Sequence, residues 1–300
     1  MASLPARLPD NAPGDFYVDR TCIDCDACRR IAPATFEQGD GHSYVARQPD
    51  GEAERRRAFM ALVACPTASI GTAARSNATE AVAAAAAFPE PVDENVSFCG
   101  FTSERSFGAW SYLVERPRGN VLVDSPRAAG PLLKELERRG GIATMFLTHR
   151  DDVADHEAFR KRFGCERVLH ADDATAGTRG LERLWTGTEP EPLAPDLLAI
   201  PTPGHTRGHA VLLYRDRYLF TGDHLAWSRR RGRLVAFRDA CWYSWADQIR
   251  SMERLLDFSF EWVLPGHGAW QHAASAAAMR DEVARCVAGM KAPRRENAAE

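Results

Sequence analysis

Thr148-His149-Arg150-Asp151-Asp152-Val153-Ala154-Asp155-His156 is the stretch on which the fold of this chain depends. The run Ala143–Thr148, which leads into His149, is short and apolar and therefore predicts a buried strand. Neutral imidazole is the commonest transition-metal ligand in proteins, and carboxylate oxygen complements it at zinc or iron sites. The end of this predicted strand is therefore a candidate metal-binding loop.

Three more ligand-type residues follow later β-rich runs. They are His205, Asp223 and His267, which come after the apolar runs Leu197–Ile200, Tyr218–Thr221 and Trp262–Leu264. Loops at strand ends are positioned by the rigid scaffold behind them, and such loops commonly carry functional residues. We expect the four loops to converge at one edge of a sheet sandwich and to form a metal site.

The order of these residues resembles the metallo-β-lactamase fold, and most closely its glyoxalase II-like branch. The resemblance covers roughly residues 95–290. The matching segments are Thr148–His156, Pro201–His209, Thr221–Asp223 and Pro265–Gly268. It implies the α/β fold class, in the form of a four-layer αββα sandwich.

The resemblance also implies a role for each matching position. The implied ligands are His149 and His205 for a first metal, Asp155, His156 and His267 for a second, and Asp223 as the bridge between them. Asp155 is further implied to orient a metal-bound hydroxide that acts as the nucleophile. The expected content is one or two divalent metals, either zinc or iron, with manganese as a third choice.

The family pattern H-x-H-x-D-H is broken at one position. Asp151 stands where the second histidine is expected, and two extra residues precede Asp155. We predict Asp151 as the replacement ligand of the first metal, with Asp152 as the alternative. A carboxylate in this position favours iron or manganese over zinc. The longer loop also leaves a one-metal centre as an alternative.

The N-terminal part carries a second ligand motif, Cys22-Ile-Asp-Cys25-Asp-Ala-Cys28, with a distant Cys65-Pro66. Three cysteines at two-residue intervals and a remote Cys-Pro predict one [4Fe-4S] cluster. Residues 14–70 resemble single-cluster bacterial-type ferredoxins, which implies a small α+β domain in front of the sandwich. A zinc ion held by the four cysteines is the alternative, although zinc sites usually draw on two separated pairs.

Composition shifts predict the domain organisation. The segments are 1–13, a disordered tail; 14–75, the ferredoxin-like domain; 76–94, a helix and linker; 95–290, the metallo-β-lactamase-like domain; and 291–300, a frayed tail. Helical periodicity and end signals predict helices over 53–64, 128–139, 155–163, 244–257 and from 273 onward.

Bulk properties exclude several function classes. The 300 residues contain no run of eighteen apolar residues, which argues against a membrane-spanning segment. The N-terminal residues lack the apolar run of a signal peptide, so we predict a cytoplasmic protein with reduced thiols. The formal net charge of −3 predicts no general affinity for nucleic acid.

Three functions are consistent with these motifs. The leading hypothesis is a metal-dependent hydrolase of a small ester, thioester or lactone, with an accessory cluster. The first alternative is an iron-dependent oxidoreductase that receives electrons from the cluster. Its iron site would be diiron, or mononuclear and dioxygenase-like. In that case we also expect a redox partner protein. The second alternative is a non-catalytic iron–sulfur sensor or electron-transfer module. No oligomeric state is predicted.

The run Arg229-Arg-Arg-Gly-Arg233 follows Asp223 within ten residues. A solvated hairpin tip is the interpretation that we favour slightly. In the other interpretation the guanidinium groups lie beside the substrate pocket and select an anionic small molecule.

Overall fold

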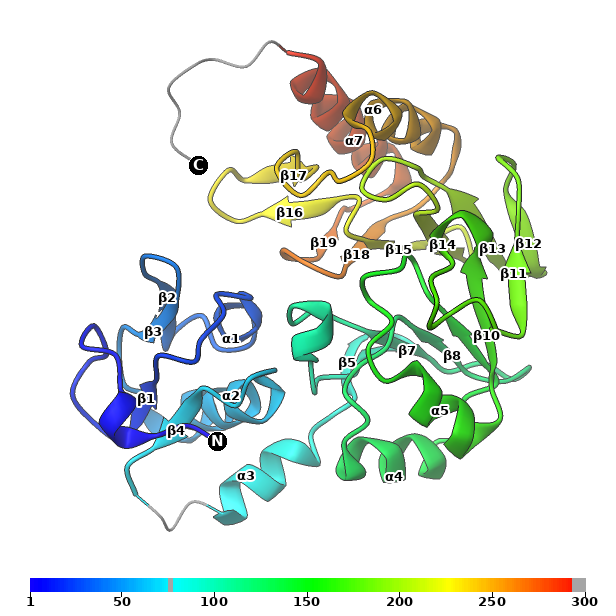
Figure 1. Ribbon diagram of the computed structural model, residues 1–300. Coiled ribbons are helices and arrows are strands. Elements are labelled where there is room, and N and C mark those ends of the chain that lie inside the picture. The colour runs from blue at the N-terminus through cyan, green and yellow to red at the C-terminus, as the bar shows by residue number, and fades with distance from the viewer. Residues whose placement is uncertain (75–77, 293–300) are drawn as a thin grey trace. The chain divides into compact units, whose positions relative to one another are not determined.

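The computed structural model describes residues 1–74 and 78–292 (Figure 1). The chain forms two compact units. The first comprises residues 1–147, 151–168 and 180–183, and the second comprises residues 148–150, 169–179 and the chain from 184 onward. Among the described residues, no helix combines the length and the apolar character needed to cross a membrane.

The first unit begins with a small α+β region. Its elements are β1 (Phe16–Val18), α1 (Ala27–Ile31), β2 (Phe36–Gln38), β3 (Ser43–Val45), α2 (Gly51–Ala64) and β4 (Ile70–Thr72). Strand β1 pairs antiparallel with β4, and β2 forms a hairpin with β3. The apolar side of α2 packs on this region through Phe59, whose ring lies 4.9 Å from that of Phe16. The predicted helix over 53–64 is present as α2.

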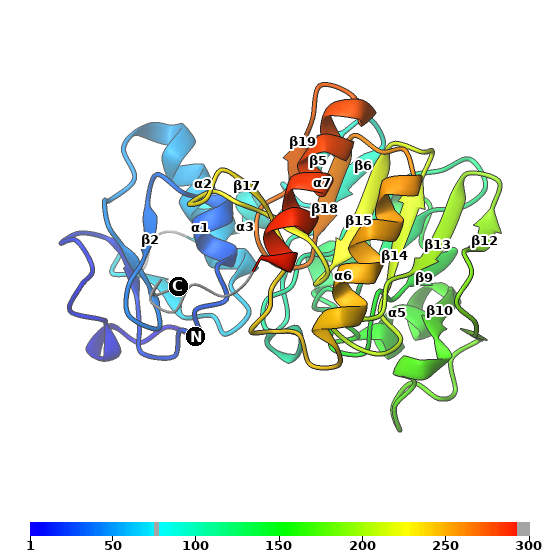
Figure 2. The ribbon, with the colours of Figure 1, turned by 90° about the horizontal axis from the view of Figure 1, so that it is seen from above.

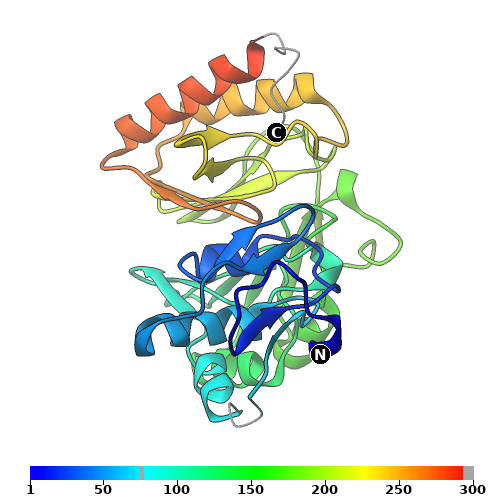
Figure 3. The same cartoon turned by 90° about the vertical axis from the view of Figure 1, so that its left-hand side faces the viewer.

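Residues 1–13 do not form the disordered tail expected from their composition. The Asn11 side chain is buried, and its Oδ1 accepts hydrogen bonds from Val18 N at 2.9 Å and Val45 N at 3.0 Å. A short 3₁₀ turn, η1 (Leu4–Ala6), precedes it, and Figure 3 shows the start of the chain against this small region. The proline and alanine content predicted disorder, but the Asn11 side chain accepts hydrogen bonds from the backbone of two strands and so orders this segment.

The first unit continues into a seven-stranded sheet. Its strands are β5 (Glu90–Asp93), β6 (Val96–Phe98), β7 (Tyr112–Val114), β8 (Val121–Val123), β9 (Thr144–Phe146), β10 (Glu166–His170) and β11 (Arg183–Trp185), in the order β11-β10-β9-β8-β7-β6-β5. Helices α4 (Gly130–Arg138) and α5 (His156–Phe163) connect the parallel strands β8, β9 and β10. Parallel neighbours need such crossovers. The predicted helices over 128–139 and 155–163 are therefore confirmed.

The segment 76–94 is only partly a linker. Helix α3 (Ala78–Ala85) occupies its first part, and residues 75–77 lie outside the described residues. Its second part contains β5, which pairs antiparallel with β6 in the register Glu90↔Phe98. The prolines did not prevent strand formation, because β5 is an edge strand and an edge tolerates missing amide donors.

The second unit is built on a six-stranded sheet in the order β12-β13-β14-β15-β18-β19. The strands are β12 (Glu191–Ala194), β13 (Leu197–Pro201), β14 (Ala210–Tyr214), β15 (Tyr218–Gly222), β18 (Trp262–Pro265) and β19 (Gln271–His272). Between β15 and β18 lie a hairpin, β16 (Ala226–Ser228) with β17 (Arg233–Val235), and helix α6 (Trp245–Arg254). Arg229–Arg231 therefore lie in the turn of a hairpin, as predicted.

Helices α6 and α7 (Ala276–Lys291) cover one face of this sheet (Figures 2 and 3). Met252 of α6 and Met279 and Val283 of α7 share a buried cluster with Val211 and Leu219 of the strands. The last helix begins at Ala276 rather than near 273, because the hydroxyl of Ser275 caps it by accepting from Ala278 N at 3.2 Å. Residues 293–300 of the predicted frayed tail lie outside the described residues.

Candidate metal centre and cysteine site

Three imidazole side chains of the second unit converge on one carboxylate oxygen. Asp223 Oδ2 lies 3.7 Å from His149 Nε2, 3.8 Å from His205 Nε2 and 3.7 Å from His267 Nε2. Two atoms that bind the same metal ion at about 2 Å lie roughly 3–4 Å apart, so these distances fit metal coordination. Three imidazoles and a carboxylate are also a donor set that zinc and iron accept. These four residues are called the Asp223 centre below.

Strand geometry explains why Asp223 and His267 meet. Asp223 directly follows β15, and His267 lies two residues beyond β18. These strands are parallel neighbours, so their carboxyl ends lie at the same sheet edge. The Thr148 carbonyl accepts from Ala210 N at 2.8 Å, which fixes the residue before His149 to β14 of the same sheet.

A buried carboxylate supports two of the ligand loops. Asp173 is 1% exposed and accepts from Arg150 N at 3.0 Å, from Thr206 Oγ1 at 2.5 Å and from Gly208 N at 2.7 Å. It thus joins the loop after His149 to the loop that carries His205. Asp173 could not be singled out from the sequence, since one aspartate in a polar segment carries no ligand signature.

Two threonine hydroxyls hold imidazole rings from behind. Thr148 Oγ1 lies 2.9 Å from Nδ1 of His149, whose Nε2 is the atom nearest to Asp223. Thr202 Oγ1 lies 2.9 Å from Nδ1 of His209. A hydrogen bond to one ring nitrogen fixes the ring orientation and the tautomer, which is the usual support of a metal-binding histidine.

Two further buried histidines stack behind the centre. The His209 ring centroid lies 5.1 Å from that of His149 and 5.4 Å from that of His224. Burial lowers the pKa of His209 well below its usual value, and neighbouring imidazoles add to this. Burial lowers the pKa of His224 to about 3. Both rings therefore stay neutral at pH 7. The sequence signal for His224 was its position next to Asp223.

The loop after His149 brings carboxylates near the imidazoles. The candidate ligand atoms of His149, Asp151 and His205 lie within 4.8 Å of one another, and so do those of His149, Asp152 and Asp223. Asp151 is exposed and Asp152 is buried. The geometry leaves both residues as candidates, as the sequence did.

Asp155 and His156 make contacts of their own within the first unit. The carboxylate of Asp155 accepts from Ala128 N at 2.7 Å and forms an ion pair with Arg105. Nδ1 of His156 lies 2.8 Å from Nη1 of Arg167. Because guanidinium only donates, this Nδ1 is the acceptor and the proton of the neutral ring sits on Nε2. Neither residue belongs to a group of three mutually close ligand atoms among the described residues, and by this criterion His267 does not either.

The four cysteines of the N-terminal motif surround one small cavity. Cys22, Cys25, Cys28 and Cys65 all line it, and none forms a disulfide. Burial raises the pKa of the Cys25 thiol to about 11 and raises that of Cys28 further. Backbone N–H groups of Ser43 and Ser69 point at the sulfurs of Cys22 and Cys65, at 3.4 Å and 3.3 Å. Clustered thiols with amide donors fit an iron–sulfur cluster, which binds as thiolates.

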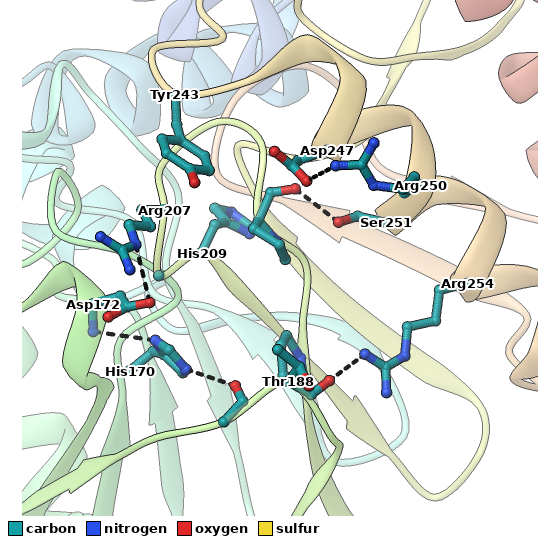
Figure 4. Close-up of a pocket in the computed structure, with 14 residues that line it drawn as sticks. His170, Asp172, Thr188, Arg207, His209, Tyr243, Asp247, Arg250, Ser251 and Arg254 are labelled. Atoms are coloured by element: carbon teal, nitrogen blue, oxygen red, sulfur yellow. Dashed lines mark hydrogen bonds and ion pairs between the residues drawn. The ribbon is translucent and has the colours of Figure 1, made fainter.

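A cavity of about 290 Å³ lies beside the loop 201–209 (Figure 4). His209 lines it, and the ring of this histidine lies 5.1 Å from that of His149 in the Asp223 centre. Its three arginines carry carboxylate partners: Arg207 pairs with Asp172 at 3.3 Å, Arg254 with Glu189 at 2.9 Å, and Arg250 with Asp247. Each of these cations therefore already has a carboxylate partner.

Two family models match the chain. Residues 106–267 match the metallo-beta-lactamase superfamily, and residues 18–72 match the 4Fe-4S single cluster domain of Ferredoxin I. Both resemblances drawn from the sequence are thereby confirmed. The second match covers all four cysteines of the N-terminal motif.

Similar proteins include two hydroxyacylglutathione hydrolases. The protein from Rhizobium etli is 34% identical over 34% of this chain and 41% of its own length, and that from Rhizobium johnstonii is 33% identical over the same shares. The chain thus spans about two fifths of the curated relatives that it matches. The solved structure of the DIM-1 metallo-beta-lactamase is 15% identical and covers 65% of this chain and 96% of its own, with a TM-score of 0.50. The predicted α/β fold class is confirmed.

Proposed function

The chain belongs to the metallo-beta-lactamase superfamily, and on that premise we propose that it is a metal-dependent hydrolase of a small thioester, ester or lactone. The convergence of three imidazole Nε2 atoms on Asp223 Oδ2 is the observation that carries the proposal. When bound there, a divalent metal ion supplies Lewis acidity and lowers the pKa of a coordinated water toward 7.

The residues around the centre orient the ligands and control access. Thr148 holds the His149 ring, and Asp173 holds the two loops that carry His149 and His205. The His149 side chain is fully buried, whereas that of His267 is 22% exposed. We therefore infer that the substrate approaches from the side of His267.

Trp242 places an exposed aromatic ring beside a second ligand of the centre. The residue is 63% exposed, and its ring lies 6.2 Å from that of His205. Its backbone N–H donates to His205 O at 2.9 Å, which fixes it to the ligand loop. An exposed aromatic ring held beside a metal ligand suits the apolar part of a small acyl substrate.

A thioester is the first substrate class to test. The similar proteins of known activity are hydroxyacylglutathione hydrolases, although the match covers part of each. Lactones and oxygen esters share the carbonyl that the metal would polarise. Arg229–Arg231 remain the candidates for selecting an anionic substrate, since they lie in the exposed hairpin turn of the second unit.

Asp155 and His156 stay in the proposal as ligands of a second metal, with Asp155 orienting the nucleophile. In this proposal Asp155 exchanges its contacts with Arg105 and the Ala128 amide for the metal. A one-metal enzyme built on the Asp223 centre needs no such exchange, and the contacts of the two residues favour it.

An iron-dependent oxidoreductase is the second candidate. The carboxylates of Asp151 and Asp152, in the same loop as His149, favour it because they make the donor set harder than one of imidazoles alone. In that case the cysteine site supplies electrons, and activity depends on the cluster.

A direct test measures hydrolysis by the anaerobically purified chain against hydroxyacylglutathione, other acyl thioesters, esters and lactones. Asp223→Asn is the test variant, and Asp257→Asn, an exposed aspartate after α6, is its matched control. We expect hydrolysis of one class by the wild type and Asp257→Asn, and a loss of at least 100-fold in Asp223→Asn. Full activity in Asp223→Asn would refute the proposal.

A further inference from the structure

The guanidinium group of Arg127 lies beside the chain segment that delivers the fourth cysteine of the cluster site. We propose that Arg127 tunes the iron–sulfur cluster: its positive charge stabilises the reduced form and raises the reduction potential. The inference rests on the proposed [4Fe-4S] cluster at Cys22, Cys25, Cys28 and Cys65, and Arg127 is a positioning residue rather than a ligand.

Hydrogen bonds fix Arg127 on the cluster side. Its Nη2 donates to Val63 O at 2.9 Å, two residues before Cys65. The next carbonyl, Ala64 O, accepts from Thr102 N at 3.2 Å and from Thr102 Oγ1 at 2.7 Å. The end of α2, which leads into Cys65, is thus held by two loop residues of the first unit, Thr102 after β6 and Arg127 after β8.

A second set of contacts joins the same segment to Asp155. Arg127 N donates to Phe101 O at 2.8 Å, and the next amide, Ala128 N, donates to Asp155 Oδ2 at 2.7 Å. Arg105, from the loop 101–109, forms the ion pair with Asp155. The segment 127–128 therefore contacts both the end of α2, just before Cys65, and Asp155, which the sequence assigns to a second metal.

The charge of Arg127 has no carboxylate partner within ion-pair distance in the described part of the chain. Its side chain is half-buried, and its Nε is buried without a hydrogen-bond acceptor. Burial lowers the pKa of this guanidinium, and the charges of Cys65 and Asp155 oppose that effect. The hydrogen bond to Val63 O holds the guanidinium beside a residue two positions before Cys65. The group stays cationic because arginine does not deprotonate in proteins.

Cluster charge supplies the physical reason for the effect. Four thiolates give the cluster site a net negative charge, and one-electron reduction adds another negative charge. A fixed cation nearby stabilises the reduced form more than the oxidised form, and nearby charge is one of the factors that set the potentials of such clusters. The negative charge of Asp155, which contacts the same segment, should lower the reduction potential.

The experiment is an anaerobic redox titration of the full chain, with the reduced cluster followed by electron paramagnetic resonance. We expect Arg127→Gln to lower the ratio of reduced to oxidised cluster about tenfold at a fixed ambient potential, which is 59 mV for a one-electron couple. Arg127→Lys keeps the charge and should stay near wild type. Arg56→Gln, an exposed arginine on α2, is the matched control and should not change the ratio.

Asp155→Asn is an independent arm and should raise the ratio, because it removes a negative charge. If Arg127→Gln loads no cluster, Arg127→Lys and Asp155→Asn are compared with wild type instead. A tenfold fall of the ratio of reduced to oxidised cluster in Arg127→Lys overturns the proposal. An unchanged ratio in Asp155→Asn overturns it too. An unchanged ratio in Arg127→Gln with a full cluster overturns it as well. If the wild-type chain binds no iron at its cysteines, the proposed cluster itself is refuted. The redox titration and the iron measurement are both independent of hydrolysis.

Discussion

At the residue scale, Asp223 is the central residue of the proposed metal centre because one of its oxygens lies within 3.8 Å of three imidazole nitrogens. The sequence predicted these four residues from their positions after strands. It could not predict Asp173 or Thr148, whose roles depend on hydrogen bonds between segments far apart in the chain. The burial of His224 could not be predicted either, because a histidine after a ligand looks the same in sequence whether it is buried or exposed.

Thr148→Val should weaken metal binding. The substitution keeps the shape of the side chain but removes the hydroxyl 2.9 Å from His149 Nδ1. Loss of such a support typically costs 10–100-fold in metal affinity or activity. Competition with a chelator measures the affinity, and Thr144→Val at the start of β9 is the control. Equal affinities in the two variants would contradict the role of Thr148.

His156→Ala and His267→Ala should differ in metal content. His267 lies 3.7 Å from Asp223, whereas His156 accepts from Arg167 and holds its ring proton on Nε2. We expect His267→Ala to lose the bound metal and His156→Ala to retain the ion of the Asp223 centre. Elemental analysis per chain measures both. Complete metal loss in His156→Ala would instead place that histidine among the essential ligands.

At the scale of elements, parallel pairing of β15 with β18 brings Asp223 and His267 to one edge. Periodicity and end signals predicted most helices and strands of both large sheets. They failed for residues 1–13, which were predicted to be disordered but which Asn11 fixes to two strands. They also failed for β5, because its prolines predicted a linker where a strand forms. In the first case hydrogen bonds to strands later in the chain override local composition, and in the second the pairing with the next strand, β6, does so.

Gly108→Ala should prevent normal cluster assembly. Gly108 has φ +81°, and a Cβ there would lie 2.7 Å from Cys25 Cβ and 2.8 Å from its Sγ. Gly232→Ala is the matched control, since its φ is +56° and its Cβ would meet open space. Iron and acid-labile sulfide per chain measure the cluster. The account expects a loss in Gly108→Ala only; equal loading would show that the loop tolerates the added methyl group.

Glu182 should stabilise the chain in a pH-dependent way. Hydrogen bonds from Arg167 lower the pKa of Glu182 to about 2 from its usual 4.5. The carboxylate therefore contributes stability above pH about 4.5, and this contribution is lost as the pH falls toward 2. Glu182→Gln should cost about 1 kcal/mol of unfolding free energy at pH 7. Urea unfolding from pH 7 to 3 checks this, and a difference that stays constant with pH would contradict it.

At the scale of the whole molecule, two family matches lie on one chain. Residues 18–72 match a single-cluster ferredoxin domain, and residues 106–267 match the metallo-beta-lactamase superfamily. Their ligand sets differ in chemistry: four thiols in one, and three imidazoles with a carboxylate in the other. Under the proposed hydrolase function, hydrolysis belongs to the Asp223 centre alone. Under the oxidoreductase alternative, activity needs both sites.

Metal analysis combined with hydrolysis, on anaerobically purified Cys25→Ser and His205→Ala variants, tests this claim most directly. The account predicts that Cys25→Ser loses the iron of its cluster but keeps the other metal and the hydrolysis of the wild type's substrate. It predicts that His205→Ala keeps the cluster iron and loses both the other metal and the hydrolysis. Loss of hydrolysis in Cys25→Ser with the second metal still bound would contradict the account.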